Sequence, residues 1–173
     1  MSDNFDRFIG RVLSHEGGYS ADRNDPGNWT GGKVGSGQLK GTKYGIAANT
    51  YPGEDIKGLT LEKAKAIYRR DFWDKIKGDQ LPPAVAFQVL DGAINSGVQR
   101  SVKWLQVASG ASADGIIGPR TLQAASGGSA WAIVLGYNSA RLEFMTGLSN
   151  WKHHGAGWAR RIAANLKHAA GDL

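Results

Sequence analysis

A glutamate and two aspartates in the first part of the chain have the types and spacing of an acid catalyst. Glu16 follows an apolar helical pattern and directly precedes Gly17-Gly18, which is typical of a helix end, so we expect its carboxylate at a helix C-terminus. We expect the helix dipole there, and desolvation by Tyr19 or Trp29, to raise its pKa. A carboxyl group with a raised pKa suits a general acid that protonates a glycosidic oxygen.

Such an acid works with a second polar or acidic group across the substrate, and the segment after Gly18 offers Asp22 and Asp25. Asp25 precedes a proline, so it could instead cap a turn. Glu16 also has an alternative, a surface bond to His15 or Lys33. Spacing alone leaves these alternatives open.

The elements that must position these groups are helices around one glycine-rich loop. Apolar residues at helical spacing predict an amphipathic helix over residues 4–15. Residues 20–45 are rich in turn formers and predict a long loop, with one short hairpin at 33–40. The expected fold class is mostly α, a helical fold with a small irregular or β-hairpin lobe near the N-terminus.

Further helices are predicted after residue 59. Thr60 should cap one with Leu61 inward, and Pro82-Pro83 should open the apolar central helix. Trp131 and Leu135 share one apolar face in the helix expected at 129–145. The remaining helices are expected at 98–108, 119–125 and 156–170.

Composition narrows the class of protein. The 173 residues suit one domain, and the net charge of +6 predicts attraction to polyanions such as nucleic acid, anionic membrane or cell wall. The absence of cysteine excludes a disulfide framework and a thiolate zinc site. Charges interrupt the apolar runs, which excludes a membrane span, and no nucleic-acid recognition motif appears, so no specific nucleic-acid partner is expected.

Three short motifs occur in order: Glu16-Gly17-Gly18-Tyr19, Asp25-Pro26-Gly27 and Thr42-Lys43-Tyr44-Gly45-Ile46. Together they resemble the signature of the glycoside hydrolase 108 N-acetylmuramidases, which are lysozyme-like endolysins. The resemblance implies a lysozyme-like fold and cleavage of the β-1,4 bond between N-acetylmuramic acid and N-acetylglucosamine in peptidoglycan, without a cofactor.

The same resemblance implies roles for individual residues. Glu16 would be the catalytic acid, and Asp25, nine positions later, would activate water or stabilise the oxocarbenium-like transition state. Thr42 would complete the site. Because Asn28-Trp29-Thr30 departs from the family pattern, Thr30 is an alternative to Thr42, and Asp22 is an alternative to Asp25. The proposed substrate-binding residues are Tyr19, Trp29, Tyr44 and Asn95.

Asp91 and Asn95 lie one turn apart on the helix opened by Pro82-Pro83, so they could face a cleft or satisfy buried backbone groups. Downstream, Leu105-Gln106 and the segment from Asp114 to Leu122 resemble peptidoglycan-binding type 3 regions. Asp114 itself could be a purely structural turn residue.

The expected organisation is a catalytic lobe at 1–80, with an active-site loop at 17–58, and a helical lobe at 81–173 that resembles the peptidoglycan-binding region. We expect both to pack as one globular unit and the protein to be a monomer. Acidic residues stand where a signal peptide needs basic ones, so we expect synthesis in the cytoplasm. The resemblance implies that a phage endolysin would then reach periplasmic peptidoglycan through a holin.

Two alternatives to an endolysin fit the same motifs: a bacterial muramidase that assists secretion, and a non-catalytic cell-wall-binding protein. The segment Trp151 to His168 carries Lys152, Arg160, Arg161 and Lys167, which suits an anionic outer-membrane surface or a merely solvated helix face. The neighbouring His153 and His154 lack the spacing of a zinc helix, so no metal site is expected.

Overall fold

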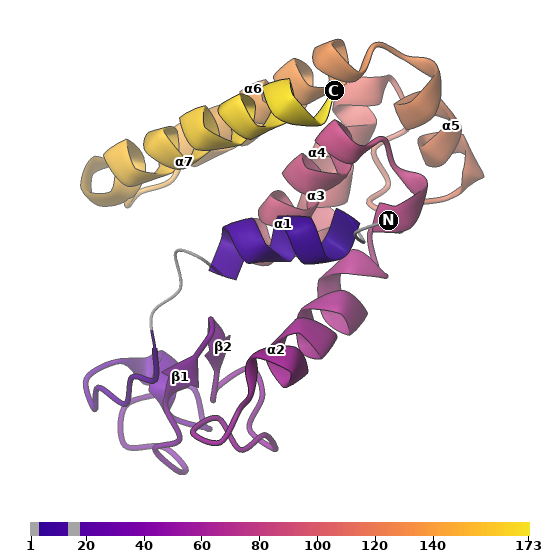
Figure 1. Cartoon of the computed structure of the whole chain (residues 1–173). Coiled ribbons are helices and arrows are strands. Elements are labelled where there is room, and N and C mark those ends of the chain that lie inside the picture. The colour runs from indigo at the N-terminus through magenta and orange to yellow at the C-terminus, as the bar shows by residue number, and fades with distance from the viewer. Residues whose placement is uncertain (1–3, 14–17) are drawn as a thin grey trace. The chain divides into compact units, whose positions relative to one another are not determined.

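The computed structural model describes residues 4–13 and 18–173, and the chain divides into two compact units, Met1–Arg69 and Arg70–Leu173. The first unit contains helix α1 (Asn4–Leu13), strands β1 (Thr42–Lys43) and β2 (Ile46–Ala47), and helix α2 (Leu61–Tyr68) (Figure 1). The second contains α3 (Pro83–Ser96), α4 (Val98–Ser109), α5 (Pro119–Gly127), α6 (Ala130–Thr146) and α7 (Trp151–Asp172). The predicted mostly helical class with a small β lobe is confirmed.

Helices α1 and α2 form the helical part of the first unit. The apolar face predicted for α1 is buried, and it includes Phe5 and Phe8. Thr60 caps α2 as predicted, because its hydroxyl accepts a hydrogen bond of 3.2 Å from the backbone nitrogen of Lys63. The two helices contact each other, and an ion pair of 3.1 Å joins Lys65 on α2 to Asp6 on α1.

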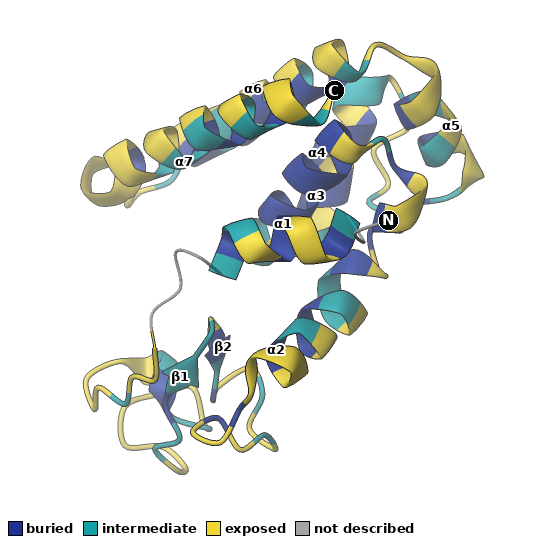
Figure 2. Ribbon diagram, viewed as in Figure 1, coloured by how far each residue is buried: buried dark blue, intermediate teal, exposed yellow. Residues whose placement is uncertain are grey.

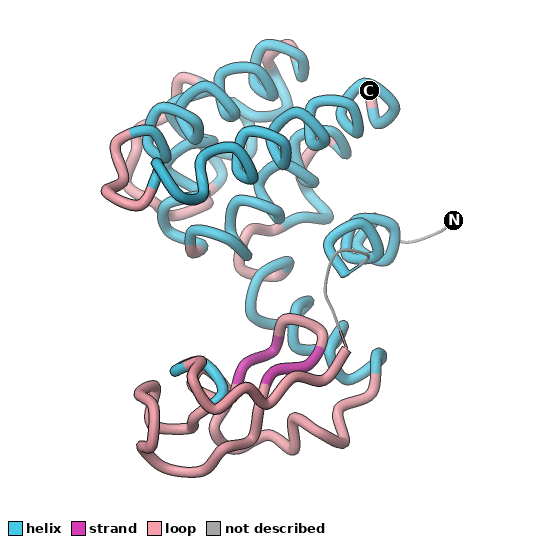
Figure 3. The backbone as a smooth tube through the Cα atoms, turned by 90° about the vertical axis from the view of Figure 1, so that its left-hand side faces the viewer, coloured by secondary structure: helices cyan, strands magenta, loops and turns pink. Residues whose placement is uncertain are grey.

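Residues 18–60 are mostly loop and contain one two-stranded hairpin (Figure 3). Thr42 pairs with Ala47 and Lys43 with Ile46 in an antiparallel register. Tyr44 and Gly45 form the two-residue turn, with φ of 52° and 74°. Positive φ at both turn residues matches the strand twist of a tight hairpin.

The hairpin predicted at 33–40 was therefore placed too early in the sequence. Residues 29–39 form a wide loop, which is closed by an antiparallel bridge between Trp29 and Leu39 and by backbone hydrogen bonds from Thr30 to Gln38 and from Gly31 to Ser36. At its tip the backbone nitrogen of Ser36 donates to the carbonyl oxygen of Lys33 over 3.0 Å. The glycines of this segment favour turns. The segment lacks facing pairs of β-forming residues, which would be needed to extend the bridge into a two-stranded sheet.

Helix α3 is the core of the second unit, as predicted. Ten of its 14 residues are buried, so that α3 appears almost entirely dark blue in Figure 2. Helices α4, α6 and α7 all contact it. An apolar helix that is surrounded on all sides needs no polar face, which explains its composition.

The predicted inward faces were wrong at several positions. Trp131 and Leu135 on α6 are 44% and 55% exposed, and Leu61 on α2 is 42% exposed. The buried face of α6 instead includes the polar residues Asn138 and Arg141. Hydrophobicity could not identify this face, because polar partners on α3 replace part of the apolar stripe.

Helix α7 begins at Trp151, earlier than the predicted start at residue 156. Glycines at positions 155 and 157 weaken the helical signal of its first turns. In the part of the chain that the structure describes, no helix combines the length and apolar character needed to cross a membrane.

Candidate active site

The loop that carries the candidate aspartates consists of two side-chain-capped turns. Asp22 Oδ1 accepts a hydrogen bond of 2.9 Å from the backbone nitrogen of Asn24, and Asp25 Oδ1 accepts one of 2.8 Å from Gly27. Asp25 thereby caps the short 3₁₀ turn Pro26–Asn28. Both aspartates are exposed, and within the described residues Oδ2 of each carboxylate accepts no hydrogen bond. Each side chain therefore stabilises a turn with one oxygen and keeps the other available.

Asn28 connects this loop to strand β1. It is 1% exposed, its Nδ2 donates to the carbonyl oxygen of Asp22 over 3.0 Å, and its Oδ1 accepts from the Thr42 hydroxyl over 2.7 Å. The backbone of Thr42 also exchanges hydrogen bonds of 2.8 and 2.9 Å with Ser20. The structure thus brings Thr42 and the aspartate loop together through a buried asparagine.

Thr30, the alternative to Thr42, has a different role. Its hydroxyl accepts a hydrogen bond of 2.9 Å from the backbone nitrogen of Gln38 and so helps to close the wide loop at 29–39. The neighbouring Trp29 is half-buried, and its indole nitrogen donates to the carbonyl oxygen of Arg23 over 2.9 Å. Of the two threonines, Thr42 is the one that is bonded to the aspartate loop.

The two tyrosines proposed to bind substrate lie near the hairpin. Tyr19 is 40% exposed, and its ring lies over the backbone of Gly41. Tyr44 is half-buried in the turn, its carbonyl oxygen accepts from the Tyr68 hydroxyl over 3.0 Å, and the Lys43 ammonium lies 5.4 Å from its ring centre. Both rings are partly exposed aromatic surface of the kind on which a sugar can stack.

More than half of the chain is similar to one known enzyme family. The family model described as "Glycosyl hydrolase 108" matches residues 9–97, a little over half of the chain. This chain belongs to the glycosyl hydrolase 108 family. It is therefore a glycosidase by family, and the matched residues include both the aspartate loop and the hairpin.

A solved structure extends the similarity beyond the family match. The chain is 35% identical to the protein in "Structure of Brucella abortus SagA", with a TM-score of 0.80, over 97% of this chain and 94% of that one. The lysozyme-like fold predicted for this glycosyl hydrolase 108 member is thereby confirmed. No curated protein matches the chain.

The remaining predicted site residues are Glu16 and Asn95. Glu16, the candidate acid, lies outside the residues that the structure describes, so its role stays a prediction. Asn95 belongs to the second unit, where its Nδ2 donates to the carbonyl oxygen of Asp91 over 2.7 Å. Its side chain lines a pocket together with several arginines.

Asp91 is the centre of a buried ionic network that sequence reasoning missed. Its carboxylate accepts from Arg141 over 2.6 Å, from Arg161 over 2.7 and 2.9 Å, and from Asn165 over 2.7 Å. Burial opposes ionisation, but the two guanidinium groups outweigh it and hold the pKa of Asp91 below its ordinary value. Two arginines within helical sequence patterns were the available signal, and their partner could not be identified without the fold.

The Asp114 turn, which carried the resemblance to peptidoglycan-binding regions, is organised by Gln106. Gln106 Nε2 donates to Asp114 Oδ1 over 2.7 Å and to Thr121 over 3.1 Å, and its Oε1 accepts from Gly115 over 2.8 Å. Hydrogen bonds from the Ile116 backbone and from Gln106 hold the pKa of the Asp114 carboxyl below its ordinary value. These contacts give Asp114 a structural role.

Within the described residues, no three histidine, aspartate or glutamate side chains are grouped closely enough to hold a metal ion. Arg161, which was predicted on a basic face of α7, is bonded to Asp91 instead. Lys152, Arg160 and Lys167 remain exposed on that helix.

Proposed function

We propose that this glycosyl hydrolase 108 member is an N-acetylmuramidase that cleaves the β-1,4 bond between N-acetylmuramic acid and N-acetylglucosamine in peptidoglycan. The observation that carries the proposal is the bond from Thr42 to Asn28, because it ties the hairpin to the aspartate loop inside the family-matched segment. Glu16 lies in the same segment and would protonate the leaving oxygen as the general acid.

The described geometry suggests how the other two groups would act. Asp25 keeps Oδ2 available and exposed, so this oxygen could accept a proton from water or stabilise positive charge on the sugar. The Thr42 hydroxyl donates its hydrogen bond to Asn28, so the hydroxyl oxygen of Thr42 can still accept one. An acceptor fixed in this way can orient a water molecule for attack.

Digestion of purified peptidoglycan tests the proposal directly. The assay compares wild type with the variants Glu16→Gln, Asp25→Asn and Thr42→Ala. The control variant is Glu143→Gln, which neutralises an exposed glutamate on α6. Fragments are reduced and identified by mass spectrometry. We expect new N-acetylmuramic reducing ends from wild type and Glu143→Gln, and at least a hundredfold slower release from Glu16→Gln.

Other outcomes reject specific parts of the proposal. Equal rates for wild type and Glu16→Gln would exclude Glu16 as the acid. Reducing ends on N-acetylglucosamine would indicate a different glycosidic bond, and cleaved peptide stems would indicate an amidase. Wall binding without any cleavage would favour a non-catalytic cell-wall-binding protein.

For the biological role we propose a phage endolysin that is made in the cytoplasm, passes a holin-opened membrane and acts as a monomer on periplasmic peptidoglycan. The motif resemblance supports this role. A secretion-assisting bacterial muramidase is the second candidate, and its support is the similarity to a protein of the bacterium Brucella abortus over nearly the whole chain. A neighbouring holin gene would support the first role, and neighbouring secretion genes the second.

A further inference from the structure

The second unit contains a pocket that the proposed catalytic groups do not explain. Its volume is about 180 Å³, and its wall includes Arg100, Arg141, Arg161, Asn95, Phe144 and Trp158. All of these residues come from α3, α4, α6 and α7, so the pocket lies entirely within one unit. Three guanidinium groups around a small pocket are an unusual concentration of positive charge.

Among the described residues, acidic side chains balance only part of the positive charge in this wall. Asp91 is the carboxylate that both Arg141 and Arg161 contact, and its two oxygens already accept from those arginines and from Asn165. No acidic side chain belongs to the described lining of the pocket. The three guanidinium groups carry three positive charges, and the one carboxylate beside them carries a single negative charge. The described wall of the pocket therefore keeps a net charge of +2.

Arg141 shows that this surplus is built into the core. Its side chain is 2% exposed, and its Nη1 donates to Asp91 Oδ2 over 2.6 Å. Its Nε is also buried and has no hydrogen-bond acceptor among the described residues. A buried cation with an unmet donor is costly, and a nearby anion would reduce that cost.

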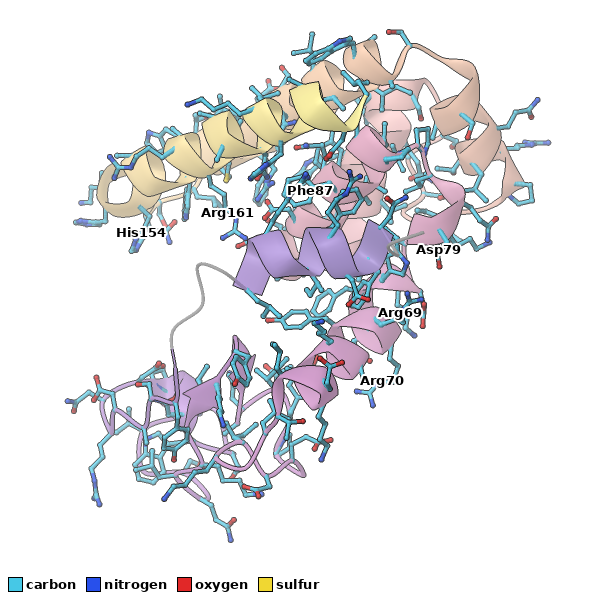
Figure 4. The ribbon with its side chains drawn as sticks, viewed as in Figure 1. Arg69, Arg70, Asp79, Phe87, His154 and Arg161 are labelled. Carbon is cyan, nitrogen blue, oxygen red and sulfur yellow. The ribbon has the colours of Figure 1, made fainter. Side chains whose placement is uncertain are left out.

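Arg161 and Arg100 are the cations that an incoming ligand can reach. Arg161, labelled in Figure 4, projects from α7 and is 30% exposed. The guanidinium of Arg100 is exposed and lies 4.3 Å from the ring centre of Phe144. The stacking itself uses none of the hydrogen-bond donors of Arg100, of which Nη1 makes a long bond of 3.4 Å to the carbonyl oxygen of Ser96.

The size and the other walls of the pocket limit the ligand further. A pocket of 180 Å³ is comparable to cavities of ~150 Å³ that hold a ligand as large as benzene, so a sugar ring with its substituents would not fit inside. Phe144 and Trp158 provide apolar surface. Asn95 donates through Nδ2 to Asp91, which leaves its amide oxygen to accept from an N–H group.

We propose that this pocket binds the terminal carboxylate of a short peptide, with Arg161 and Arg100 as donors and Asn95 as acceptor for the adjacent amide. This inference rests on the proposed function in naming the source, the free end of a peptidoglycan peptide stem. The lactyl carboxylate of a muramic residue without a stem shares the chemistry but lacks an N–H group next to the carboxylate.

Calorimetric titration of the full chain at low salt tests the proposal. The probes are N-acetyl-D-alanyl-D-alanine, its C-terminal amide, N-acetylmuramic acid and inorganic phosphate. We expect the peptide acid to bind most tightly and its amide on the order of tenfold more weakly, because the amide loses a charge-assisted contact. Arg100→Gln should weaken the peptide acid by a similar factor, whereas Arg120→Gln, at an exposed position on α5, should not.

Arg100→Gln is the decisive variant because it leaves the bonds of Asp91 intact, and its thermal unfolding is measured in parallel. Arg161→Gln should also weaken binding, but it removes a partner of Asp91. The proposal would be overturned if N-acetylmuramic acid or phosphate bound more tightly than the peptide acid. Equal affinities for the peptide acid and its C-terminal amide would also overturn it. So would equal affinities of the Arg100→Gln and Arg120→Gln variants.

Peptidoglycan cleavage by the same preparations separates the two proposals. Cleavage by wild type without binding of the peptide acid would reject the pocket and leave the muramidase in place. Selective binding of the peptide acid without any cleavage would reject the muramidase and leave the pocket.

Discussion

The Thr42 hydroxyl donates a 2.7 Å hydrogen bond to the amide oxygen of Asn28, which is 1% exposed. Asn28 in turn donates to the carbonyl oxygen of Asp22, so one buried amide joins strand β1 to the aspartate loop. Because water does not reach this amide, the threonine hydroxyl is the group that satisfies it. The same hydroxyl therefore supports the fold of the loop and is a candidate for catalysis.

The first prediction separates these two roles. Thr42→Val removes the donor and leaves Asn28 Oδ1 buried without its partner, so we expect the free energy of unfolding to fall by about 1–3 kcal/mol. Thr42→Ser keeps the hydroxyl and should lose less than about 1 kcal/mol. Urea denaturation measures both. Equal stability of the two variants would mean that the hydrogen bond contributes little to folding.

Gly41 supplies a second prediction, with Gly35 as its matched control. Both have left-handed φ, of 83° and 79°, but a Cβ atom on Gly41 would meet the carbonyl oxygen of Ser20 and come within 2.7 Å of the Tyr19 ring. A Cβ atom on Gly35 meets nothing within 4 Å. Gly35→Ala should cost about 1–2 kcal/mol of unfolding free energy from backbone strain alone. Gly41→Ala should cost more and should displace Tyr19.

Thermal unfolding and the fluorescence of the aromatic residues check this pair. Similar losses in the two alanine variants would show that the contact between Tyr19 and Gly41 is not tightly packed. A larger loss for Gly41→Ala would support a rigid position for Tyr19, which a stacking role requires.

The sequence was sufficient to predict the helices whose signals are local. The cap at Thr60, the proline start of α3 and the apolar face of α1 were correct, because capping and periodicity depend on neighbouring residues. The hairpin was misplaced because the turn at Tyr44-Gly45 requires positive φ at a tyrosine, which residue type does not announce.

The candidate site was predictable only in part, because its hydrogen bonds join residues that are far apart in the sequence. The resemblance to the family motifs indicated Asp25 and Thr42, but not the asparagine between them that connects the loop to the strand. In the sequence, Asn28 stands out only as part of the segment that departs from the family pattern. The ionic network of Asp91 was also missed, because Arg141 and Arg161 lie 50 and 70 positions away in sequence.

Asp114 provides a third prediction, about structure rather than binding. Asp114→Ala removes the acceptor for Gln106 and for the Ile116 backbone, so the midpoint of urea denaturation should fall below that of wild type. Binding to purified cell walls, measured by sedimentation well below the unfolding temperature, should stay within about twofold of wild type. Glu143→Ala serves as the exposed control on α6. Loss of wall binding by folded Asp114→Ala would instead assign Asp114 to the binding surface.

The last prediction concerns how the buried network of Asp91 makes the stability of the fold depend on pH. Although burial favours the neutral carboxyl, Arg141 and Arg161 lower the pKa of Asp91 below the ordinary 3.8. A carboxyl with a depressed pKa stabilises the fold fully above the ordinary value, and this contribution is lost as pH falls through the lower, folded-state pKa. Acid should therefore weaken the wild type through this group below about pH 4.

Asp91→Asn tests the sign of this effect. At pH 7 it leaves two cations without their carboxylate, Arg141 among them fully buried, so we expect a loss of about 3–5 kcal/mol of unfolding free energy. As pH falls below about 4, the unfolded wild type takes up a proton at Asp91 before the folded protein does, so the difference between the two proteins should shrink. Urea denaturation followed by circular dichroism at a series of pH values measures this difference, with Asp74→Asn as the exposed control. A difference that stays constant down to pH 2 would show that folding does not lower the pKa of Asp91.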